Sequence, residues 1–365
     1  TKDSLAAESG TEELKVQQLF KLMVTNNASD LHLTPGTSPC LRINGSVVRV
    51  KTNVLTAEDT KRLIYAVLTE DQRNEFEKNL DLDCSFGIKG LARFRCNVFY
   101  SRGGVAAVFR QIPSIIPDFE QLNLPAIFLK MTSVSNGLIL VTGPTGSGKS
   151  TTLAALLDKL NQNEPGHIIT LEDPIEFVHQ HKKCIINQRE IGSDSLSFVN
   201  ALRGLLRQDP DIVLVGELRD VETIEMALTV AETGHLVFGT LHTNSAVQTI
   251  NRLINVFPAD RQDQVRTLLS FVLQGVIAQQ LLPKTSGGRL AVHEILIPNP
   301  AIRNLIREDK IHQIYSQIQI GQDTTGMMTM NQSLRAGVEK GLISSELAMT
   351  YSPVPEELSK MLGLK

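Results

Sequence analysis

The sequence has few cysteines and no excess of either charge. Its four cysteines are scattered and form no Cys-x-x-Cys pair, so we expect neither a zinc site nor a disulfide framework, and buried thiols in a reducing compartment instead. The 36 Lys and Arg residues nearly balance the 39 Asp and Glu residues, which gives a formal net charge of −3. A nucleic-acid partner usually requires a basic footprint, and this balance predicts none.

Long hydrophobic runs are also missing. No apolar stretch approaches the roughly 18 residues of a membrane-spanning helix, and no secretory signal is visible. We therefore expect a soluble, cytoplasmic protein that reaches a membrane only through its partners. The 365 residues are enough for two domains with a sizeable core.

The most informative stretch is a glycine-rich loop between an apolar run and a predicted helix. The run Leu138–Val141 is short enough for a buried strand, and a helical segment follows the loop. The loop has the pattern G-x-x-x-x-G-K-S, formed by Gly143, Pro144, Thr145, Gly146, Ser147, Gly148, Lys149 and Ser150. Strand, loop and helix in this order are the context that a P-loop requires. The stretch predicts a nucleoside triphosphate site.

Each part of the P-loop has a chemical role. Its glycines let backbone N–H groups turn toward a phosphate, and the N-terminus of the helix adds partial positive charge. Lys149 can reach the β- and γ-phosphates of ATP, and the Ser150 hydroxyl can ligate Mg²⁺. Thr151, the next residue, completes the predicted nucleotide-binding set.

Carboxylates follow two further apolar runs. Residues 167–171 predict a strand followed by Glu172, Asp173 and Glu176, and residues 211–215 predict a strand followed by Glu217. Open α/β sheets bind ligands at the carboxyl ends of their strands, where a carboxylate can deprotonate an attacking water or hold Mg²⁺. The chemistry alone leaves open whether Glu176 or Glu217 is the base. Surface acids on a polar loop are the alternative for the first group.

Two histidines flank another apolar run. His235 precedes residues 236–241, and His242 follows them. A metal site is not supported, because no third ligand stands at a sensible spacing. Histidines at strand ends are commonly structural, but His242, at the carboxyl end, is the better placed of the two to sense a γ-phosphate.

An arginine-rich hairpin precedes the P-loop. The chain alternates as two strands around Gly103–Gly104, which we predict as a two-residue turn. This turn makes Arg95 and Arg110 diagonal neighbours on the face that also carries Arg93, where like charges repel. One interpretation is a solvated or locally paired basic face. The other is a set of side chains that reach a phosphate bound by a neighbouring subunit.

The domain organisation follows from a proline-containing segment. Two prolines between residues 113 and 118 interrupt both helix and strand, so we predict an N-terminal domain at residues 1–112, a linker at 113–118 and a second domain at 119–365. In the second domain, apolar runs alternate with helical segments to about residue 250, which is typical of a parallel α/β sheet.

Three further elements are predicted from periodicity. Residues 56–79 predict one helix, and residues 261–282 predict another. Residues 290–297 then predict a strand, and a helical C-terminal region follows.

These stretches resemble the signature motifs of secretion ATPases of the type II and type IV pilus class. The motifs are the P-loop, the acidic box Leu171–Glu176, the strand end Gly216–Asp220 and the histidine box Thr233–Thr243. Residues Ala28–Leu33 look like that family's N-terminal domain, and Ala301–Glu308 is similar to the motif of its retraction member.

The resemblance implies a RecA-like P-loop motor domain, a smaller α+β PAS-like N-terminal domain, and a homohexamer with ATP between subunits. By matching positions, it implies that Glu176 activates the water and that Glu217 is the Walker B glutamate. The family's trans arginines, which reach the ATP of a neighbouring subunit, fall in the stretch that contains Arg93, Arg95 and Arg110. Its histidine box matches His235 and His242.

The function implied by the resemblance is a hexameric, Mg²⁺-dependent ATPase that powers type IV pilus retraction, and so twitching motility, from the cytoplasmic face of the inner membrane. The implied partners are an inner-membrane platform protein of the pilus and, as a further candidate, an accessory retraction ATPase. The alternatives are that the chain is itself the accessory ATPase, a nucleic-acid translocase, or a nucleotide-binding module without turnover.

Overall fold

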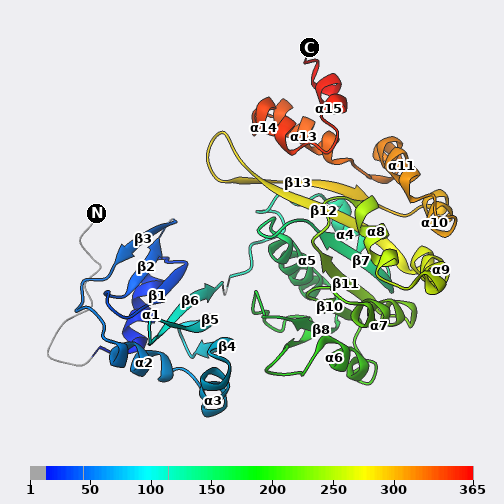
Figure 1. Cartoon of the computed structure of the whole chain (residues 1–365). Helices are drawn as coiled ribbons and strands as arrows, with labels where there is room; N and C mark the ends of the chain where they lie inside the picture. The colour runs from blue at the N-terminus through cyan, green and yellow to red at the C-terminus, as the bar shows by residue number, and fades with distance from the viewer. Residues whose placement is uncertain (1–13, 44, 114, 365) are drawn as a thin grey trace. The chain divides into compact units, whose positions relative to one another are not determined.

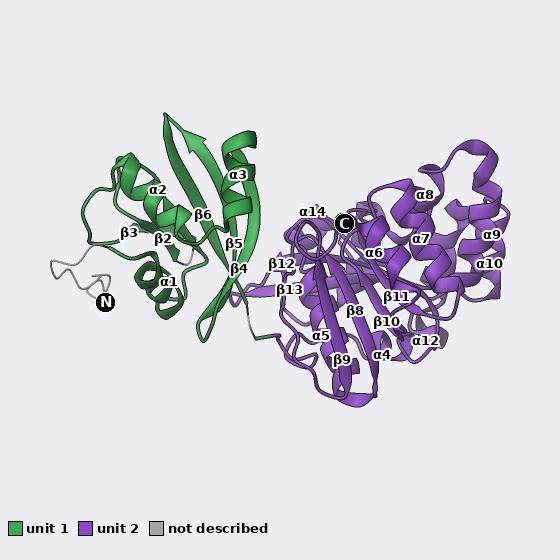
Figure 2. Cartoon of the chain, turned by 90° about the horizontal axis from the view of Figure 1, so that it is seen from below, with its two compact units in different colours: residues 1–115 green, residues 116–365 purple. Residues whose placement is uncertain are grey.

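The computed structural model describes residues 14–43, 45–113 and 115–364. The chain divides into two compact units between Ile115 and Ile116, inside the stretch predicted as the linker (Figure 1 and Figure 2). Each unit has its own sheet and its own hydrophobic core.

In its described residues, the first unit consists of a six-stranded antiparallel sheet and three helices. The strand order is β3-β2-β1-β6-β5-β4. The strands are β1 (Asp30–Leu33), β2 (Cys40–Ile43), β3 (Ser46–Arg49), β4 (Asp81–Ile88), β5 (Ala92–Ser101) and β6 (Gly104–Ile112). The helices are α1 (Val16–Thr25), α2 (Ala57–Tyr65) and α3 (Glu70–Asn79). Alternate apolar strand residues such as Leu31 and Phe109 form one core with Phe20 of α1 and Leu63 of α2. The other face of the sheet carries Arg95 and Arg110.

The helix predicted over residues 56–79 is in fact two helices. α2 ends at Tyr65, and α3 begins at Glu70 with Thr69 as its N-cap. Thr69 and Gln72 form a capping box, which satisfies the free N–H groups of a new helix start. A single helix was therefore the wrong prediction, because this local capping signal allows the chain to begin a second one.

The β5–β6 turn lies one residue earlier than predicted. Ser101 pairs with Gly104, and the turn residues Arg102 and Gly103 have φ values of 51° and 77°, as a type I′ turn requires. Arg95 therefore lies directly opposite Arg110 and not diagonally from it. The pairing of β5 with β6 differs from the predicted pairing by two residues, and side chains of a strand alternate between the two faces. The three arginines therefore share one face, as predicted.

The second unit is a seven-stranded sheet with helices on both faces. The strand order is β13-β12-β7-β11-β10-β8-β9, and only the edge strand β13 runs antiparallel to its neighbour. The strands are β7 (Gly137–Thr142), β8 (Gly166–Glu172), β9 (Cys184–Glu190), β10 (Ile212–Val215), β11 (Leu236–Leu241), β12 (Leu273–Pro283) and β13 (Arg289–Leu296). The predicted α/β class is confirmed.

The two faces of this sheet carry different helices (Figure 2). One face, which includes Ile139 and Val141, packs against α4 (Ile127–Met131) and α5 (Lys149–Asn163). The opposite face, which includes Leu138 and Leu140, packs against a second group of helices. These are α6 (Phe198–Leu205), α7 (Val221–Glu232), α8 (Ala246–Asn255), α9 (Gln262–Val272) and α10 (Pro300–Arg307). Burial on both faces explains why these strands have continuous apolar sequences.

The second half of the helix predicted over residues 261–282 is a strand. A 3₁₀ turn (Ala259–Arg261) and α9 are helical, but from Leu273 the chain continues as β12, between β7 and β13. A strand buried on both faces is nearly continuous in apolar residues, and periodicity alone does not separate it from a buried helix.

The C-terminal region is helical, as predicted. After α10 and a 3₁₀ turn (Ile311–Gln313), it contains α11 (Ile314–Ile320), α12 (Gln322–Thr325), α13 (Met330–Glu339), α14 (Ser345–Tyr351) and α15 (Pro355–Leu362). Among the described residues, none of these or the preceding helices is long and apolar enough to cross a membrane.

Candidate functional site

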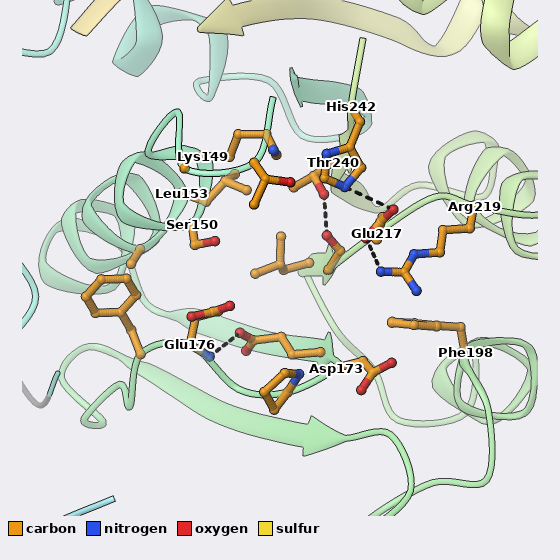
Figure 3. A pocket seen from close by; sticks show the side chains of 18 of the residues that line it. Lys149, Ser150, Leu153, Asp173, Glu176, Phe198, Glu217, Arg219, Thr240 and His242 are labelled. Atoms are coloured by element: carbon orange, nitrogen blue, oxygen red, sulfur yellow. Dashed lines mark hydrogen bonds and ion pairs between the residues drawn. The ribbon is translucent and has the colours of Figure 1, made fainter. Parts of the chain in front are cut away.

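Four loops of the second unit line one pocket (Figure 3). They follow β7, β11, β10 and β8, which are consecutive strands of the sheet. Each loop supplies a predicted site residue to the pocket: Lys149 after β7, His242 after β11, Glu217 after β10 and Glu176 after β8. This is the sheet edge at which open α/β folds bind ligands.

The P-loop joins β7 to α5. Gly143, Gly146 and Gly148 have φ values of 142°, 80° and 87°, which glycine adopts without steric cost. Gly148 is the N-cap of the 15-residue helix α5, so the positive end of the helix dipole lies at the loop. The loop therefore has the backbone shape and the charge that bind phosphate.

Lys149 folds back over the P-loop. Its Nζ donates hydrogen bonds to the carbonyl oxygens of Gly143, at 2.7 Å, and Pro144, at 3.1 Å. Burial lowers the pKa of Lys149, although the nearby Glu217 carboxylate opposes this effect. Of the predicted nucleotide-binding set, Thr145, Gly146, Lys149 and Ser150 line the pocket.

Glu217 is held from two sides. Arg219 Nη2 donates to Glu217 Oε2 at 2.6 Å, and His242 Nε2 lies 3.2 Å from Glu217 Oε1, as Figure 3 shows. The Arg219 hydrogen bond, with a smaller contribution from His242, holds the pKa of Glu217 below its ordinary value, although partial burial opposes the shift. Glu217 is therefore ionised near neutral pH, as a ligand of a hard cation should be.

Glu172 and Glu176, from the same acidic box, have different environments. Glu172 is buried, and its Oε1 accepts hydrogen bonds from Thr170 Oγ1 at 2.6 Å and Gln188 Nε2 at 3.2 Å. Burial raises the pKa of Glu172. Its Oε2 accepts the backbone N–H of Glu176 at 3.2 Å, while the Glu176 residue itself is exposed at the pocket. Glu172 therefore anchors the loop that presents Glu176.

Side chains of β9 hold the same loop from the edge of the sheet. Gln188 Nε2 donates to the Phe177 carbonyl oxygen at 2.8 Å, and Gln188 Oε1 accepts the His179 N–H at 2.7 Å. Glu190 Oε2 accepts the Ile175 N–H at 3.1 Å. The loop between β8 and β9 is thus fixed through its backbone, which leaves the Glu176 side chain available to a ligand.

The two predicted histidines lie at opposite ends of β11. His242 lines the pocket. His235 precedes the strand, and its Nδ1 lies 3.0 Å from the Val230 carbonyl oxygen near the end of α7. A six-residue strand separates them, which corresponds to about 20 Å. His235 is not among the pocket residues, so its assignment to a catalytic histidine box stays a prediction.

The three predicted arginines lie on the face of the first unit's sheet that points away from its hydrophobic core. Arg110 Nε donates to the buried carboxylate of Asp30 on β1 at 2.8 Å, and Arg95 Nη2 lies 3.7 Å from Asp83 Oδ2 on β4. Arg93 Nη2 donates to a serine hydroxyl of β4 at 2.7 Å. Neighbouring strands therefore supply partners that the hairpin alone lacks. The Arg110 side chain is nevertheless 68% exposed.

The pocket fits a divalent cation bound together with a phosphate. Mg²⁺ prefers oxygen ligands, and it usually takes one or two protein ligands beside phosphate oxygens and water. The Ser150 hydroxyl and the Glu217 carboxylate both line the pocket and offer oxygen atoms of this kind.

Several residues of the site were not predicted from the sequence. Arg219 lies in the motif Gly216–Asp220, and Thr240 lies in the motif Thr233–Thr243. Thr240 Oγ1 donates to the Gly216 carbonyl oxygen in the turn after β10. Their proximity to Glu217 and His242 in the sequence was a usable signal. Gln188 gave no such signal, because its role depends on the pairing of β8 with β9.

Comparison with known proteins places the whole chain among related ATPases. The family "Type II/IV secretion system protein" matches residues 6–287. The chain is 52% identical over 343 residues to the type IV pilus "retractation" ATPase PilT of Pseudomonas aeruginosa, with 94% of this chain and 99% of that protein covered. It is 41% identical over 352 residues to the type IV pilus ATPase PilU of the same organism, with 96% and 92% covered.

A solved structure agrees with this similarity. The crystal structure of the pilus retraction motor PilT with bound ADP has a TM-score of 0.91 and 54% identity to this chain, and the match covers 96% of this chain and 100% of that one. The similarity in fold therefore extends over both units.

Proposed function

Since the chain belongs to the family of type II/IV secretion system proteins, we propose that it is an ATP-hydrolysing motor that powers type IV pilus retraction, and with it twitching motility. The observation that carries this proposal is the convergence of Lys149, Glu176, Glu217 and His242 in one pocket. The similarity to the PilT retraction ATPase over 94% of the chain supports the specific process.

Each of these pocket residues has its own role in the proposed hydrolysis. Lys149 and the P-loop N–H groups bind the β- and γ-phosphates, and Ser150 and Glu217 hold Mg²⁺, which when bound neutralises phosphate charge. Glu176 accepts a proton from the water whose oxygen attacks the γ-phosphorus. A new P–O bond to that water forms while the bond to the β-phosphate oxygen breaks, which yields ADP and phosphate. His242, which lines the same pocket, is the candidate contact for the γ-phosphate.

We propose that the working form is a homohexamer in which the arginines of one subunit complete the site of the next. Arg93, Arg95 and Arg110 share one face of the first unit, and an exposed guanidinium such as that of Arg110 can stabilise phosphate charge. The motor would act on an inner-membrane platform protein of the pilus, at the cytoplasmic face, and an accessory retraction ATPase is a candidate second partner.

Two alternative functions receive less support. An accessory retraction ATPase of the same family is less favoured, because the chain has a helix at the retraction-type motif and is 52% identical to the PilT protein but 41% identical to PilU. Complementation of a strain that lacks the retraction ATPase separates the two. A nucleic-acid translocase is not supported by the net charge of −3, and stimulation of hydrolysis by polynucleotide would favour it.

The first experiment is to measure Mg²⁺-dependent phosphate release from ATP as a function of subunit concentration. If the site is shared between subunits, the rate per subunit should rise steeply and then reach a plateau. The Lys149→Ala variant is the blank, because it lacks the ammonium that binds the phosphates. A flat rate per subunit at a dilution where mass measurement shows monomers would contradict the shared site.

The pH dependence of hydrolysis should report the Arg219–Glu217 pair. Arg219 lowers the pKa of Glu217, so Glu217 should remain ionised, and hydrolysis active, to a lower pH than an isolated glutamate would allow. In Arg219→Gln this pKa rises, and the acid limb of the kcat/KM profile should move to higher pH. Arg335→Gln, which removes a surface pair with Glu339 on α13, is the matched control. If the acid limb of the kcat/KM profile lies at the same pH in Arg219→Gln as in wild type, protonation of Glu217 does not cause the loss of activity at low pH.

A further inference from the structure

A buried glutamine stands directly behind the P-loop. Gln279 lies on β12, whose Ala278 pairs with Thr142 at the end of β7. It is 2% exposed and does not belong to the residues that line the pocket. Buried side-chain amides are costly unless their donors and acceptors are satisfied, so its contacts indicate what it is for.

The side-chain amide of Gln279 forms one hydrogen bond on each side of the start of α5. Its Oε1 accepts the hydroxyl proton of Thr152 at 2.8 Å, and its Nε2 donates to the carbonyl oxygen of Ser147 at 2.6 Å. Thr152 is in the first turn of α5, and Ser147 is in the P-loop, immediately before the helix N-cap. One side chain therefore ties the loop and the helix to the central sheet.

The backbone and side chain of Gln279 also restrict two P-loop glycines. A Cβ atom at Gly143 would lie 2.2 Å from the Gln279 carbonyl oxygen, and one at Gly148 would lie 2.9 Å from Gln279 Nε2. These glycines are therefore needed for close approach to β12 as well as for their positive φ angles. The P-loop is packed against Gln279 at its start, and again where it meets α5.

We propose that Gln279 is a positioning residue that holds the P-loop in its phosphate-binding shape without touching the nucleotide. The inference rests on the proposed nucleotide-binding function. Preorganised donors bind a charged group better than donors that must first be ordered. When the Gln279 amide is removed, the Ser147 carbonyl and the Thr152 hydroxyl lose their buried partners, and the loop can leave the geometry that presents its N–H groups.

The test is the dissociation constant of the full chain for ADP and for Mg²⁺-ATP at 20 °C, with fluorescent nucleotide analogues as probes. Gln279→Leu, which keeps the approximate volume and removes both hydrogen bonds, should raise both constants tenfold or more. Thr152→Val, which removes one of the two bonds, should raise them about threefold. Gln280→Leu, the next residue of β12, is the matched control and should leave them within twofold of wild type.

A purely structural role predicts a different pattern. It would lower the midpoint of thermal unfolding of the nucleotide-free Gln279→Leu variant and leave its nucleotide affinity at 20 °C unchanged. Dissociation constants within twofold of wild type in folded Gln279→Leu would overturn the proposal. If that variant does not fold, Thr152→Val decides, and an unchanged affinity there has the same consequence. Failure of the wild-type chain to bind either nucleotide would instead refute the proposed function.

Discussion

Replacement of Arg110 by alanine should lower the rate of ATP hydrolysis by about 10³- to 10⁵-fold, the range known for arginines that act on a neighbour's phosphate. Arg110 is suited to this role because Asp30, which is buried, holds its Nε at 2.8 Å while the side chain stays 68% exposed. Nucleotide affinity should change only a few fold, since the P-loop contacts are intact. Arg93→Ala should behave in the same way.

A mixing experiment separates action in trans from action within one chain. Arg110→Ala subunits keep an intact P-loop, and Lys149→Ala subunits keep the arginine. If the arginine acts on the neighbouring subunit, a mixture of the two inactive variants should recover part of the wild-type rate, because some interfaces then contain one intact half from each. If it acts within its own chain, no site in the mixture is complete and no activity returns.

The control for the arginine substitution is Arg49→Ala, which removes an exposed arginine at the end of β3 in the same unit. Its hydrolysis rate should match that of wild type. If Arg110→Ala also hydrolyses ATP at the wild-type rate, Arg110 has no part in catalysis. The local pairing with Asp30 would then be its whole role.

Glu176→Gln should lower kcat by about 10²- to 10⁴-fold, the usual contribution of a general base, and should leave the Mg²⁺ requirement unchanged. Glu176 is exposed at the pocket and is positioned through its backbone N–H by Glu172, so its carboxylate is available to a water. Glu217→Gln should instead raise the Mg²⁺ concentration needed for half-maximal hydrolysis, because the ionised carboxylate between Arg219 and His242 is the predicted cation ligand.

Mg²⁺ titrations of hydrolysis at saturating ATP distinguish the two glutamates. Glu232→Gln, at the exposed end of α7, is the control for loss of a carboxylate and should match wild type. The roles are exchanged if Glu217→Gln loses turnover at an unchanged Mg²⁺ requirement while Glu176→Gln shifts that requirement.

The sequence by itself determined the class of the second unit and the location of its pocket. The P-loop is contiguous and lies between a buried strand and a helix, so its shape follows from local residues. Glu176, Glu217 and His242 each follow a short apolar run, and such runs form parallel strands when both faces of a sheet are covered. Because the carboxyl ends of parallel strands share one edge, the order of runs and polar residues in the sequence is enough to place these three side chains at the same edge of the sheet.

The tertiary structure alone decided the pairings that join distant parts of the chain. Arg110 meets Asp30 across 80 residues of sequence, and Gln279 meets Thr152 across 127. The register that places Arg95 opposite Arg110 depends on which two residues form the turn, and a shift of two residues preserves the same alternation of faces. Residues 273–283 form a strand because β7 and β13 pair with them on either side. Such choices are settled by the partners that the fold supplies, and no local pattern in the sequence encodes them.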